Sequence, residues 1–466
     1  MDTGTESQNE KTLVIGGGIT GLTAAWRLLE AGREVELLEA DTRTGGVIRT
    51  EVIDGFLAEM GPNTLQETRE ETARLIEELG LTAQRVPADA KAKNRFILRD
   101  GRPRPLPFSP PALFLGSFFS PRARMRLLAE PFLRRAPPEC RETVAEFVER
   151  RLGREILDYA VNPFVAGTFA ARPGDLSLRH AFPRLHRMEQ EHGSLIRAGL
   201  FGRRYRPKGP RGIFSFVNGL RAIPEALTER LGATLRTGVR VTGLDSRPSG
   251  GWRVRVKTAD GPETLSAGSV VLAVPPHALK QIELNGNSFE NRLSLEKRLP
   301  APPLAVMFFA CRRDQVRHPL NGFGMLVPEK EKRKILGVLF SSSLFAGRAP
   351  KNHVSLTVFA GGSRQPDLAR LPEVELEKVV RKELYELLGV EGPPCTLRHA
   401  FWPNVIPHYP LDHDSLLADL DRIENEHPRL LIGGTVRQGV SLGDCIGSGF
   451  SLAARAEKLV TPTART

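Results

Sequence analysis

Three glycines near the amino terminus have the spacing of a loop that binds the phosphates of a nucleotide. Gly16, Gly18 and Gly21 form the pattern G-x-G-x-x-G. In this pattern the first glycine allows a tight turn, the second lets the backbone approach a pyrophosphate, and the third lets a helix pack closely on a sheet. Glu39 follows where a carboxylate can accept hydrogen bonds from ribose hydroxyls, and it disfavours a ribose 2′-phosphate. These residues predict a dinucleotide site rather than a tight turn without a ligand.

The elements that must position these residues follow in the order strand, glycine turn, helix and strand. Residues 13–15 are an apolar run of the kind found in buried parallel strands. Residues 22–31 are good helix formers, and Gly32 stands where a helix usually ends. Residues 35–38 form the second strand, directly before Glu39. In this arrangement the N-terminal N–H groups of the helix point at the phosphates.

The residues after the second strand indicate which dinucleotide is bound. Arg43 and Arg49 place two cations near the same pyrophosphate. Gly45 and Gly46 lie between them and keep the backbone flexible. This R-x-G-G-x-x-R-T pattern resembles flavoproteins of the amine-oxidase superfamily, which hold FAD, whereas NAD-binding Rossmann units usually lack it. We therefore predict FAD as the cofactor.

Length and composition indicate a soluble protein of several subdomains. The 466 residues exceed one ordinary core, and the apolar and charged fractions of 40% and 26% are those of globular proteins. We expect no signal peptide and no membrane-spanning segment, because the first residues are polar and every apolar run is short. The cysteines are far apart and favour a reducing cytosol over a metal site or a disulfide framework. They are Cys140, Cys311, Cys395 and Cys445.

The net charge of +12 has three interpretations. A nucleic-acid partner is not expected, because the basic residues are dispersed and no known binding module is present. The charge could attract an anionic substrate or an anionic membrane surface. It could also be only a solvated, arginine-rich surface. The charge alone does not decide between the last two.

Residues 103–140 differ from the rest of the chain, because prolines alternate there with large apolar residues and arginines follow. Apolar bulk beside clustered cations predicts docking into a membrane interface. The alternative is a helical lid that packs on its own domain, and the two can coexist. The apolar residues are Phe108, Leu113, Phe114, Leu115, Phe118 and Phe119, and the arginines are Arg122, Arg124, Arg126, Arg134 and Arg135.

The rest of the chain alternates between strand-like runs and helices. Residues 214–231 predict a helix that returns the chain to the nucleotide domain, and residues 444–459 predict a helix of small residues whose N-terminus can point at a flavin. Strand-like runs lie at 234–244, 252–258, 269–274, 302–311, 335–340, 353–360 and 430–434. We predict an α/β fold of mixed α+β content with a discontinuous Rossmann-like FAD domain (1–90, 211–300, 426–466). A mainly helical membrane-associating insertion (91–210) and a mixed-sheet substrate domain (301–425) complete it.

Short motifs along nearly the whole chain carry a family resemblance. GGGITGL (16–22), GGVIRT (45–50) and EMGPN (59–63) are shared with amine oxidases and carotenoid desaturases. More specific are NRF (94–96), DLSLRHAFP (175–183), MEQEHGSLI (188–196), GFGMLVP (322–328), IPHYPLDH (406–413) and GVSLGDCIGSG (439–449). The sequence resembles the protoporphyrinogen oxidase family, oxygen-dependent flavoenzymes of haem biosynthesis, together with its coproporphyrinogen-oxidising relatives.

The resemblance implies a set of FAD contacts in four parts of the chain. They come from the glycine loop, the segment after the second strand, the Gly-Pro turn, and the late segments near the last helix. The implied contacts are Gly16, Gly17, Gly18, Ile19, Thr20, Gly21, Glu39, Arg43, Gly46, Val47, Gly61, Pro62, Asn63, Thr64, Val239, Trp402, Val440, Ser441 and Leu442.

The resemblance also implies a substrate site. Arg95 is expected to bind a propionate carboxylate, and a reduced tetrapyrrole needs apolar walls with cations at its rim. The implied walls are Phe164, Gly167, Phe323, Leu326 and Phe359. Arg95 could instead be a solvated residue at a strand end, and Phe323 and Leu326 could be core residues of the second sheet.

The expected reaction is hydride transfer from the porphyrinogen to flavin N5, repeated three times, with dioxygen reoxidising the flavin and forming hydrogen peroxide. No side chain is predicted to be catalytic and no metal is expected, because the cofactor carries the chemistry. The expected partners are the porphyrinogen and dioxygen, with a homodimer and handover to the chelatase of haem synthesis also implied. The expected location is cytoplasmic, peripheral on the inner face of the cell membrane.

Three alternatives stay open from the sequence. Coproporphyrinogen III could replace protoporphyrinogen IX as substrate. The enzyme could be a flavin amine oxidase or desaturase for another apolar substrate, or a porphyrin-binding flavoprotein without turnover. The chain also departs from the family pattern at His408, which either serves as a base or packs locally, and at Gly443.

Overall fold

A five-stranded parallel sheet forms the centre of the first domain. The structure is a computed structural model, and it describes residues 11–67, 69–107, 112–113, 116–201 and 212–460. The strand order is β10-β2-β1-β14-β22. β1 (Thr12–Ile15) lies between β2 (Val35–Leu38) and β14 (Ser269–Leu272), and the outer strands are β10 (Leu235–Arg236) and β22 (Leu430–Ile432). The sheet therefore joins segments from the beginning, the middle and the end of the chain.

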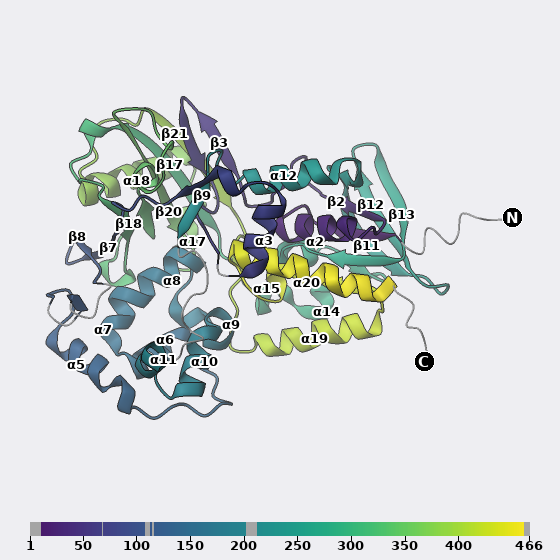
Figure 1. Cartoon of the computed structure of the whole chain (residues 1–466), viewed down its shortest axis with the longest axis horizontal. Coiled ribbons are helices and arrows are strands. Elements are labelled where there is room, and N and C mark those ends of the chain that lie inside the picture. The colour runs from purple at the N-terminus through teal and green to yellow at the C-terminus, as the bar shows by residue number, and fades with distance from the viewer. Residues whose placement is uncertain (1–10, 68, 108–111, 114–115, 202–211, 461–466) are drawn as a thin grey trace.

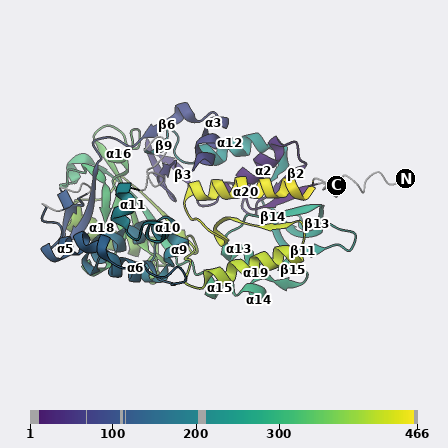
Figure 2. The same cartoon turned by 60° about the horizontal axis from the view of Figure 1, so that its bottom comes forward.

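Alternate residues of this sheet face two different apolar cores. Val14 packs toward α2 (Ile19–Glu30), α3 (Glu70–Glu78), α12 (Ala222–Leu231) and α20 (Leu442–Val460). Leu13 and Ile15 pack toward the opposite core, which includes α19 (His413–Glu426). Figure 2 shows α20 on one side of β14 and α19 on the other. Because both faces are covered, most residues of the central strands are apolar.

A meander follows on the α19 side of the sheet, at one end of the molecule (Figure 1). β11 (Arg240–Ser246), β12 (Trp252–Thr258) and β13 (Gly261–Ala267) pair antiparallel in sequence order. The short strands β15 (Glu283–Leu284) and β16 (Asn287–Ser288) extend this sheet. The helices α13 (Pro276–Leu279), α14 (Phe289–Leu293) and α15 (Leu295–Arg298) complete this region.

The second large sheet has seven strands in the order β21-β17-β20-β19-β18-β7-β8. Along β17, Met307 and Phe309 face α18 (Glu373–Leu388), whereas Val306 and Phe308 face the β3–β4 hairpin. The strands are β7 (Asn94–Arg99), β8 (Arg102–Pro105), β17 (Leu304–Arg312), β18 (Gly322–Leu326), β19 (Gly337–Leu339), β20 (His353–Gly361) and β21 (Thr396–Trp402). The short helices α16 (Ser341–Leu344) and α17 (Pro366–Ala369) adjoin β20.

Two small sheets connect these domains. β3 (Thr50–Ile53) and β4 (Phe56–Glu59) form a hairpin, and β9 (Ile213–Phe216) pairs with β5 (Leu65–Gln66) and β6 (Arg85–Pro87). The expected helix over residues 214–231 is therefore correct only for its second part, α12 (Ala222–Leu231). Residues 213–216 form a strand instead, because β5 and β6 offer it partners that are distant in sequence.

The insertion is helical and has its own core, which includes Phe147 and Leu176. The carboxylate of Glu130, which is buried, accepts hydrogen bonds from the buried Arg151 guanidinium and from the backbone N–H groups of Leu195 and Ile196. The helices are α5 (Pro121–Ala129), α6 (Val144–Arg151), α7 (Arg154–Ile156), α8 (Asn162–Phe169), α9 (Leu178–Ala181), α10 (Pro183–His192) and α11 (Leu195–Phe201). A π-helical turn, η3 (Leu157–Val161), joins α7 to α8.

The proline-rich segment contributes to this core as well as to the surface. Phe118 and Phe119 are buried in the insertion, as a lid that packs on its own domain would require. Phe108, Phe114 and Leu115 lie outside the described residues. No helix in the described parts of the chain is both long and apolar enough to cross a bilayer. β7 and β8 form the hairpin that Asp100 and Gly101 predict within the mainly helical span 91–210, and this hairpin joins the seven-stranded sheet.

Candidate functional site

The glycine loop between β1 and α2 leaves open space at one of its glycines. Gly16 has a φ of +110°, and a Cβ atom there would lie 2.7 Å from the carbonyl oxygen of Ala273. A Cβ atom on Gly21 would lie 1.9 Å from the carbonyl oxygen of Gly16. A Cβ atom on Gly18 would meet no described atom within 4 Å. Gly18 thus borders an open space at the N-terminus of α2, where backbone N–H groups can bind a phosphate.

Glu39 holds the glycine loop against the end of β2. Its Oε2 accepts a hydrogen bond from the N–H of Gly17 at 2.5 Å, and its Oε1 accepts one from the N–H of Asp41 at 2.7 Å. Its carbonyl oxygen accepts a hydrogen bond from the N–H of Val239 at 2.8 Å. The structure therefore brings Gly17, Glu39 and Val239 together at the C-terminal ends of β1 and β2.

The loop after β2 lies on the glycine loop. The N–H of Gly45 donates to the carbonyl oxygen of Gly17 at 2.8 Å, and a Cβ atom on Gly46 would come within 3.4 Å of the Cα of Gly18. The Nη2 of Arg43 donates to the carbonyl oxygen of Gly46 at 2.7 Å. Arg43 therefore braces the loop that covers the glycine turn.

Further contacts lead from this loop to the Gly-Pro turn. A Cβ atom on Gly61 would lie 1.9 Å from the carbonyl oxygen of Val47. Asn63 Nδ2 donates to the carbonyl oxygen of Gly61 at 2.9 Å, and Trp402 Nε1 donates to that of Met60 at 2.8 Å. The implied FAD contacts gathered here are Val47, Gly61, Pro62, Asn63, Thr64 and Trp402.

The last helix begins beside the same loop. Ser441 Oγ accepts a hydrogen bond from the N–H of Asp444 at 3.1 Å, as a residue that caps a helix does. Thr20 Oγ1 donates to the carbonyl oxygen of Cys445 at 3.1 Å. The start of α20 therefore lies next to the start of α2, and it carries the implied contacts Val440, Ser441 and Leu442.

The sequence analysis missed Glu59, a buried carboxyl two residues before Gly61. Thr50 Oγ1 donates to its Oε2 at 2.6 Å, and the N–H of Leu220 donates to its Oε1 at 2.8 Å. Burial raises the pKa of Glu59 to about 7, against the opposing effect of these hydrogen bonds and of the Arg348 cation. Glu59 belongs to the EMGPN motif, but its burial depends on partners that lie far away in sequence.

Three of the implied substrate-wall residues, Gly167, Leu326 and Phe359, come together where α8 meets the seven-stranded sheet. A Cβ atom on Gly167 would lie 2.6 Å from Cδ2 of Leu326, so α8 and β18 are in contact. Leu326 pairs with Gly337, and Gly337 pairs with Phe359. Because directly paired residues project from the same face of a sheet, Leu326 and Phe359 share the face that α8 covers. Phe164 of α8 is 44% exposed.

Arg95 and Phe323 form a second group on neighbouring strands. The guanidinium carbon of Arg95 lies 5.0 Å from the ring centroid of Phe323, within the range of a cation–π interaction. Phe323 packs against Phe345 in a cluster separate from that of Leu326. The Arg95 side chain is exposed, and partial burial lowers its pKa. Arg95 is thus a cation near the start of β7, beside β18.

His408 has a local role in the structure. The ring is buried, and Nε2 lies 3.0 Å from the carbonyl oxygen of Phe169, to which it can donate a hydrogen bond. Burial lowers the pKa of His408. The ring therefore ties the IPHYPLDH segment to the end of α8.

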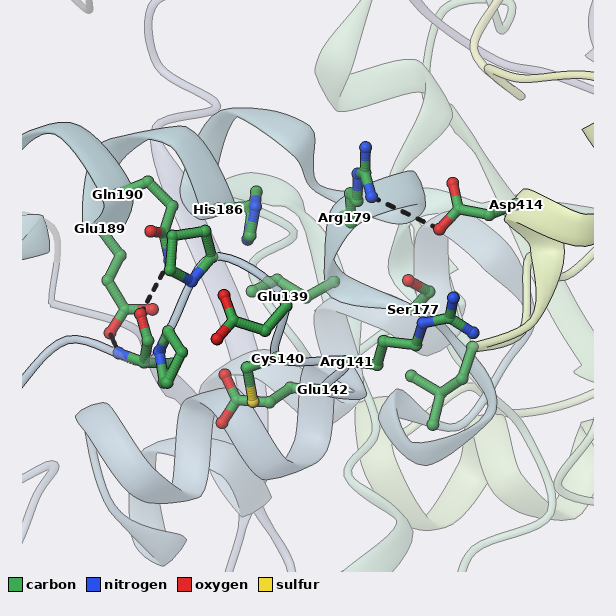
Figure 3. A pocket seen from close by; sticks show the side chains of 15 residues that line it. Glu139, Cys140, Arg141, Glu142, Ser177, Arg179, His186, Glu189, Gln190 and Asp414 are labelled. Atoms are coloured by element: carbon green, nitrogen blue, oxygen red, sulfur yellow. Dashed lines mark hydrogen bonds and ion pairs between the residues drawn. The ribbon is translucent and has the colours of Figure 1, made fainter.

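A separate pocket lies between the insertion and the start of α19 (Figure 3). Its lining mixes the carboxylates of Glu139 and Glu142 with the cations of Arg141 and Arg179. Arg179 Nη1 lies 3.4 Å from the carboxylate of Asp414. Because acids and bases alternate around it, this pocket favours neither an anion nor a cation, and we assign it no part in the site above.

Comparisons with known proteins place the chain in a family. The sequence pattern of the flavin-containing amine oxidoreductases matches residues 19–456, and the chain belongs to this family. The structure is similar to that of a cyclohexylamine oxidase from Brevibacterium oxydans IH-35A, which covers 97% of this chain and 99% of its own with a TM-score of 0.70 at 18% identity. The predicted mixed α/β fold of an FAD protein is confirmed.

Within that family the chain groups with the protoporphyrinogen oxidases. It is 33% identical to protoporphyrinogen oxidase 2 of Arabidopsis thaliana over 95% of this chain and 93% of the relative. It is 34% identical to the mitochondrial enzyme of Nicotiana tabacum over 96% and 94%. A crystal structure provisionally assigned to this activity, from Exiguobacterium sp. 255-15, has a TM-score of 0.82 at 23% identity and covers 96% of this chain and 99% of its own.

The chain is therefore an FAD-dependent oxidoreductase, as its motifs predicted. Three features of the site fit the dinucleotide. The space beside Gly18 can take a pyrophosphate, the N-terminus of α2 faces that space, and Glu39 stands at the end of β2 for a ribose. The individual contact residues stay predictions.

Proposed function

We propose that this protein catalyses the oxygen-dependent oxidation of protoporphyrinogen IX to protoporphyrin IX in haem biosynthesis. The observation that carries the proposal is the similarity to protoporphyrinogen oxidases over nearly the whole length of both chains. This similarity includes the helical insertion and the seven-stranded sheet, which supply the proposed substrate walls. The amine oxidases of similar structure share only the fold, because their identity to this chain is low.

The proposed site matches the shape and charge of a porphyrinogen. The macrocycle is a broad apolar disc, and we place it beside the contact of Gly167 with Leu326, against the sheet face that carries Leu326 and Phe359. Phe359 belongs to an apolar cluster that includes Met60 and Trp402, next to the Gly-Pro turn where the flavin ring is expected. Arg95, near the start of β7 in this sheet, is the proposed partner of a propionate.

The chemistry divides between cofactor and protein. Bound FAD supplies a hydride acceptor that dioxygen then reoxidises, with hydrogen peroxide as the second product. The residues of this chain bind and orient: the walls hold the disc flat, Arg95 fixes its edge, and the apolar lining excludes water. We assign no proton transfer to any side chain.

We also propose that the insertion docks on an anionic membrane surface. Met125, Leu128 and Phe132 are 65%, 52% and 82% exposed, and their spacing of three and four residues places them on one side of α5 and the turn after it. The exposed cations Arg122 and Arg134 flank them. Large apolar side chains with adjacent arginines are suited to the headgroup region.

The location and the other partners stay predictions of the resemblance. We place the protein in the cytoplasm, peripheral on the inner face of the cell membrane. A homodimer and handover of the porphyrin to a chelatase are compatible with attachment to a common surface, and both are open to direct measurement.

Substrate choice tests the proposed function. The purified holoprotein is supplied in air with protoporphyrinogen IX or coproporphyrinogen III, and porphyrin fluorescence and hydrogen peroxide are followed. We expect a higher kcat/KM for protoporphyrinogen, with peroxide formed in proportion to porphyrin. A preference for coproporphyrinogen would keep the chemistry and change the substrate. Failure to oxidise either one, with FAD bound, would contradict the proposal and favour a binding protein.

A further inference from the structure

One arginine connects the three elements that carry the proposed substrate walls. Arg364 follows β20 in the chain. Its Nη1 donates to the carbonyl oxygen of Val327 at 2.6 Å, directly after β18. Its Nη2 donates to the carbonyl oxygen of Asn162 at 2.9 Å and to the side-chain Oδ1 of the same residue at 2.7 Å. Asn162 is the first residue of α8.

The turn before Arg364 holds the other end of the same helix. The N–H of Ser363 donates to the carbonyl oxygen of Ala170 at 2.8 Å, just after α8 ends. Gly362 has a φ of +63°, and a Cβ atom there would lie 2.3 Å from that same carbonyl oxygen. Arg172 Nη1 donates back to the carbonyl oxygen of Ser363 at 2.6 Å. The residues after β20 therefore brace α8 at both ends.

The beginning of α8 needs such a brace. It follows the π-helical turn η3, which widens the helix and interrupts its regular hydrogen bonding. Asn162 also accepts a hydrogen bond at Oδ1 from the N–H of Glu329 at 2.9 Å. Asn162 is therefore held by two groups from the region after β18 and β20, in addition to its own helix.

The guanidinium is suited to this role. Burial lowers the pKa of Arg364 to about 10, so that the group stays charged at neutral pH. Charge-assisted hydrogen bonds are stronger than neutral ones, and the planar fork of arginine fixes the directions of its N–H groups. A lysine ammonium is a point charge and cannot reproduce this geometry.

We propose that Arg364 is a positioning residue that sets the spacing between α8 and β18, and with it the width of the porphyrinogen slot. The inference rests on the proposed function, because the slot is defined by the proposed walls Gly167, Leu326 and Phe359. Gly167 and Leu326 already touch. A small movement of α8 would therefore change the distance between the proposed walls. Arg364 itself touches neither FAD nor substrate in this account.

The test compares Arg364→Ala and Arg364→Lys with a matched control. Arg370→Ala removes another arginine, which directly follows α17, is exposed and is paired with Asp367. We expect both Arg364 variants to retain FAD. Their KM for protoporphyrinogen should rise roughly 10-fold or more, because the walls that bind the substrate are displaced. Misplacing a substrate by about 1 Å can cost up to about 100-fold in rate. We expect Arg364→Lys not to restore the wild-type KM, and Arg370→Ala to behave as wild type.

A second variant keeps the proposal testable if the Arg364 variants fail to fold. Asn162→Ala removes the side-chain partner of Arg364 and Glu329 on α8 but keeps the carbonyl acceptor, and it should raise the KM in the same direction by a smaller factor. A wild-type KM in a folded Arg364→Ala protein, or in Asn162→Ala where the former does not fold, would overturn the proposal.

Hydrogen exchange separates this inference from the proposed function. In the substrate-free holoprotein, Arg364→Ala should speed amide exchange in residues 162–170 and leave α2 unchanged. If wild type does not oxidise protoporphyrinogen, the proposed function fails whatever the exchange shows. If wild type is active but α8 exchanges equally in both proteins, only the positioning role fails.

Discussion

Gly18 and Gly21 belong to one loop but meet different requirements. At Gly21 the backbone of the same loop occupies the position of a Cβ atom, whereas at Gly18 that position is open. The absence of a side chain at Gly18 therefore leaves room for a ligand, which we take to be the pyrophosphate of FAD. Folding alone does not require a glycine there.

We accordingly expect Gly18→Ala to fold and to lose FAD. A lengthened phosphate contact costs about 1.5–3 kcal/mol, which corresponds to an FAD dissociation constant raised roughly 10- to 100-fold. The measurement is FAD titration of the apoprotein. Gly174→Ala is the matched control, because a Cβ atom there also meets no described atom within 4 Å and the residue belongs to the insertion, not to the glycine loop. Equal FAD affinity of Gly18→Ala and wild type would contradict the assignment.

Glu59 predicts a dependence of stability on pH. Its pKa is raised from 4.5 to about 7 by burial, so in this window the unfolded chain releases the proton before the folded protein does. The stability from Glu59 is fully present below pH 4.5 and is lost as the pH rises through 7, by up to about 3 kcal/mol. Glu59→Gln has no titratable group at this position. The Tm of wild type should therefore fall relative to that of Glu59→Gln as the pH rises from 5 to 8.

The control for this prediction is Glu51→Gln on β3. Glu51 is partly exposed and paired with Arg49, so its removal should change Tm by an amount that varies little with pH. A Tm difference between Glu59→Gln and wild type that is the same at pH 5 and pH 8 would show that Glu59 is ionised in the folded protein.

The residue types of the site were predictable from sequence, but several of their contacts were not. The spacing of the glycines and of Glu39 follows from a local βαβ unit, so the sequence could reveal it. Arg43 was expected to lie near a pyrophosphate, which stays a prediction; in the structure its guanidinium donates to a carbonyl oxygen of its own loop. Glu59 was missed because its partner Leu220 is 161 positions away.

At the scale of elements, the close packing of α20 on α2 positions both helix starts beside the glycine loop. A Cβ atom on Gly449 would lie 2.7 Å from the carbonyl oxygen of Thr20 and 2.7 Å from Cβ of Thr23. The small residue at this position thus lets the two helices approach closely. The packing connects the last part of the chain to the first.

We expect Gly449→Leu to separate these helices. Overpacking of this kind costs about 1–3 kcal/mol, and it should lower both the denaturation midpoint and FAD affinity. Ala454→Leu is the control on the same helix, because Ala454 is exposed. Unfolding in denaturant, followed by flavin fluorescence, measures both effects. If the two variants unfold alike, the close contact does not position α20.

Elements with local signals were predicted best. The central strands of the parallel sheet are short apolar runs, and the helix expected over residues 444–459 matches α20 (Leu442–Val460). The segment 213–216 was expected to be helical but forms β9, because its pairing with β5 and β6 depends on residues far away in the chain. The spacing of apolar residues along the sequence does not reveal strand-pairing partners that lie far away in the chain.

At the scale of the whole molecule, the exposed apolar side chains of the insertion form the proposed membrane-docking surface. The sequence analysis singled out Phe118 and Phe119, which are buried, and did not single out Met125, Leu128 and Phe132, which are exposed. Composition could show that the segment is apolar and cationic. Only the packing of α5 decides which of its side chains reach the surface.

We expect the triple variant Met125→Ser, Leu128→Ser, Phe132→Ser to lose binding to anionic vesicles. Each large apolar side chain contributes about 1.5–3 kcal/mol on burial, so the loss should exceed about 100-fold. Vesicle sedimentation measures it, and Tm should change little because these residues are exposed. Val374→Ser, Tyr385→Ser, Phe401→Ser is the matched control, with side chains exposed on the substrate domain. Equal vesicle binding by both triple variants would contradict docking through the insertion.

The central claim is that one site places a porphyrinogen against FAD. The most direct measurement is anaerobic mixing of the oxidised holoprotein with protoporphyrinogen IX, followed through the visible absorbance of the flavin. We predict that protoporphyrinogen bleaches the flavin before air is admitted, and that cyclohexylamine under the same conditions does not. A flavin that stays oxidised with protoporphyrinogen, or that is bleached by the amine instead, would contradict the account.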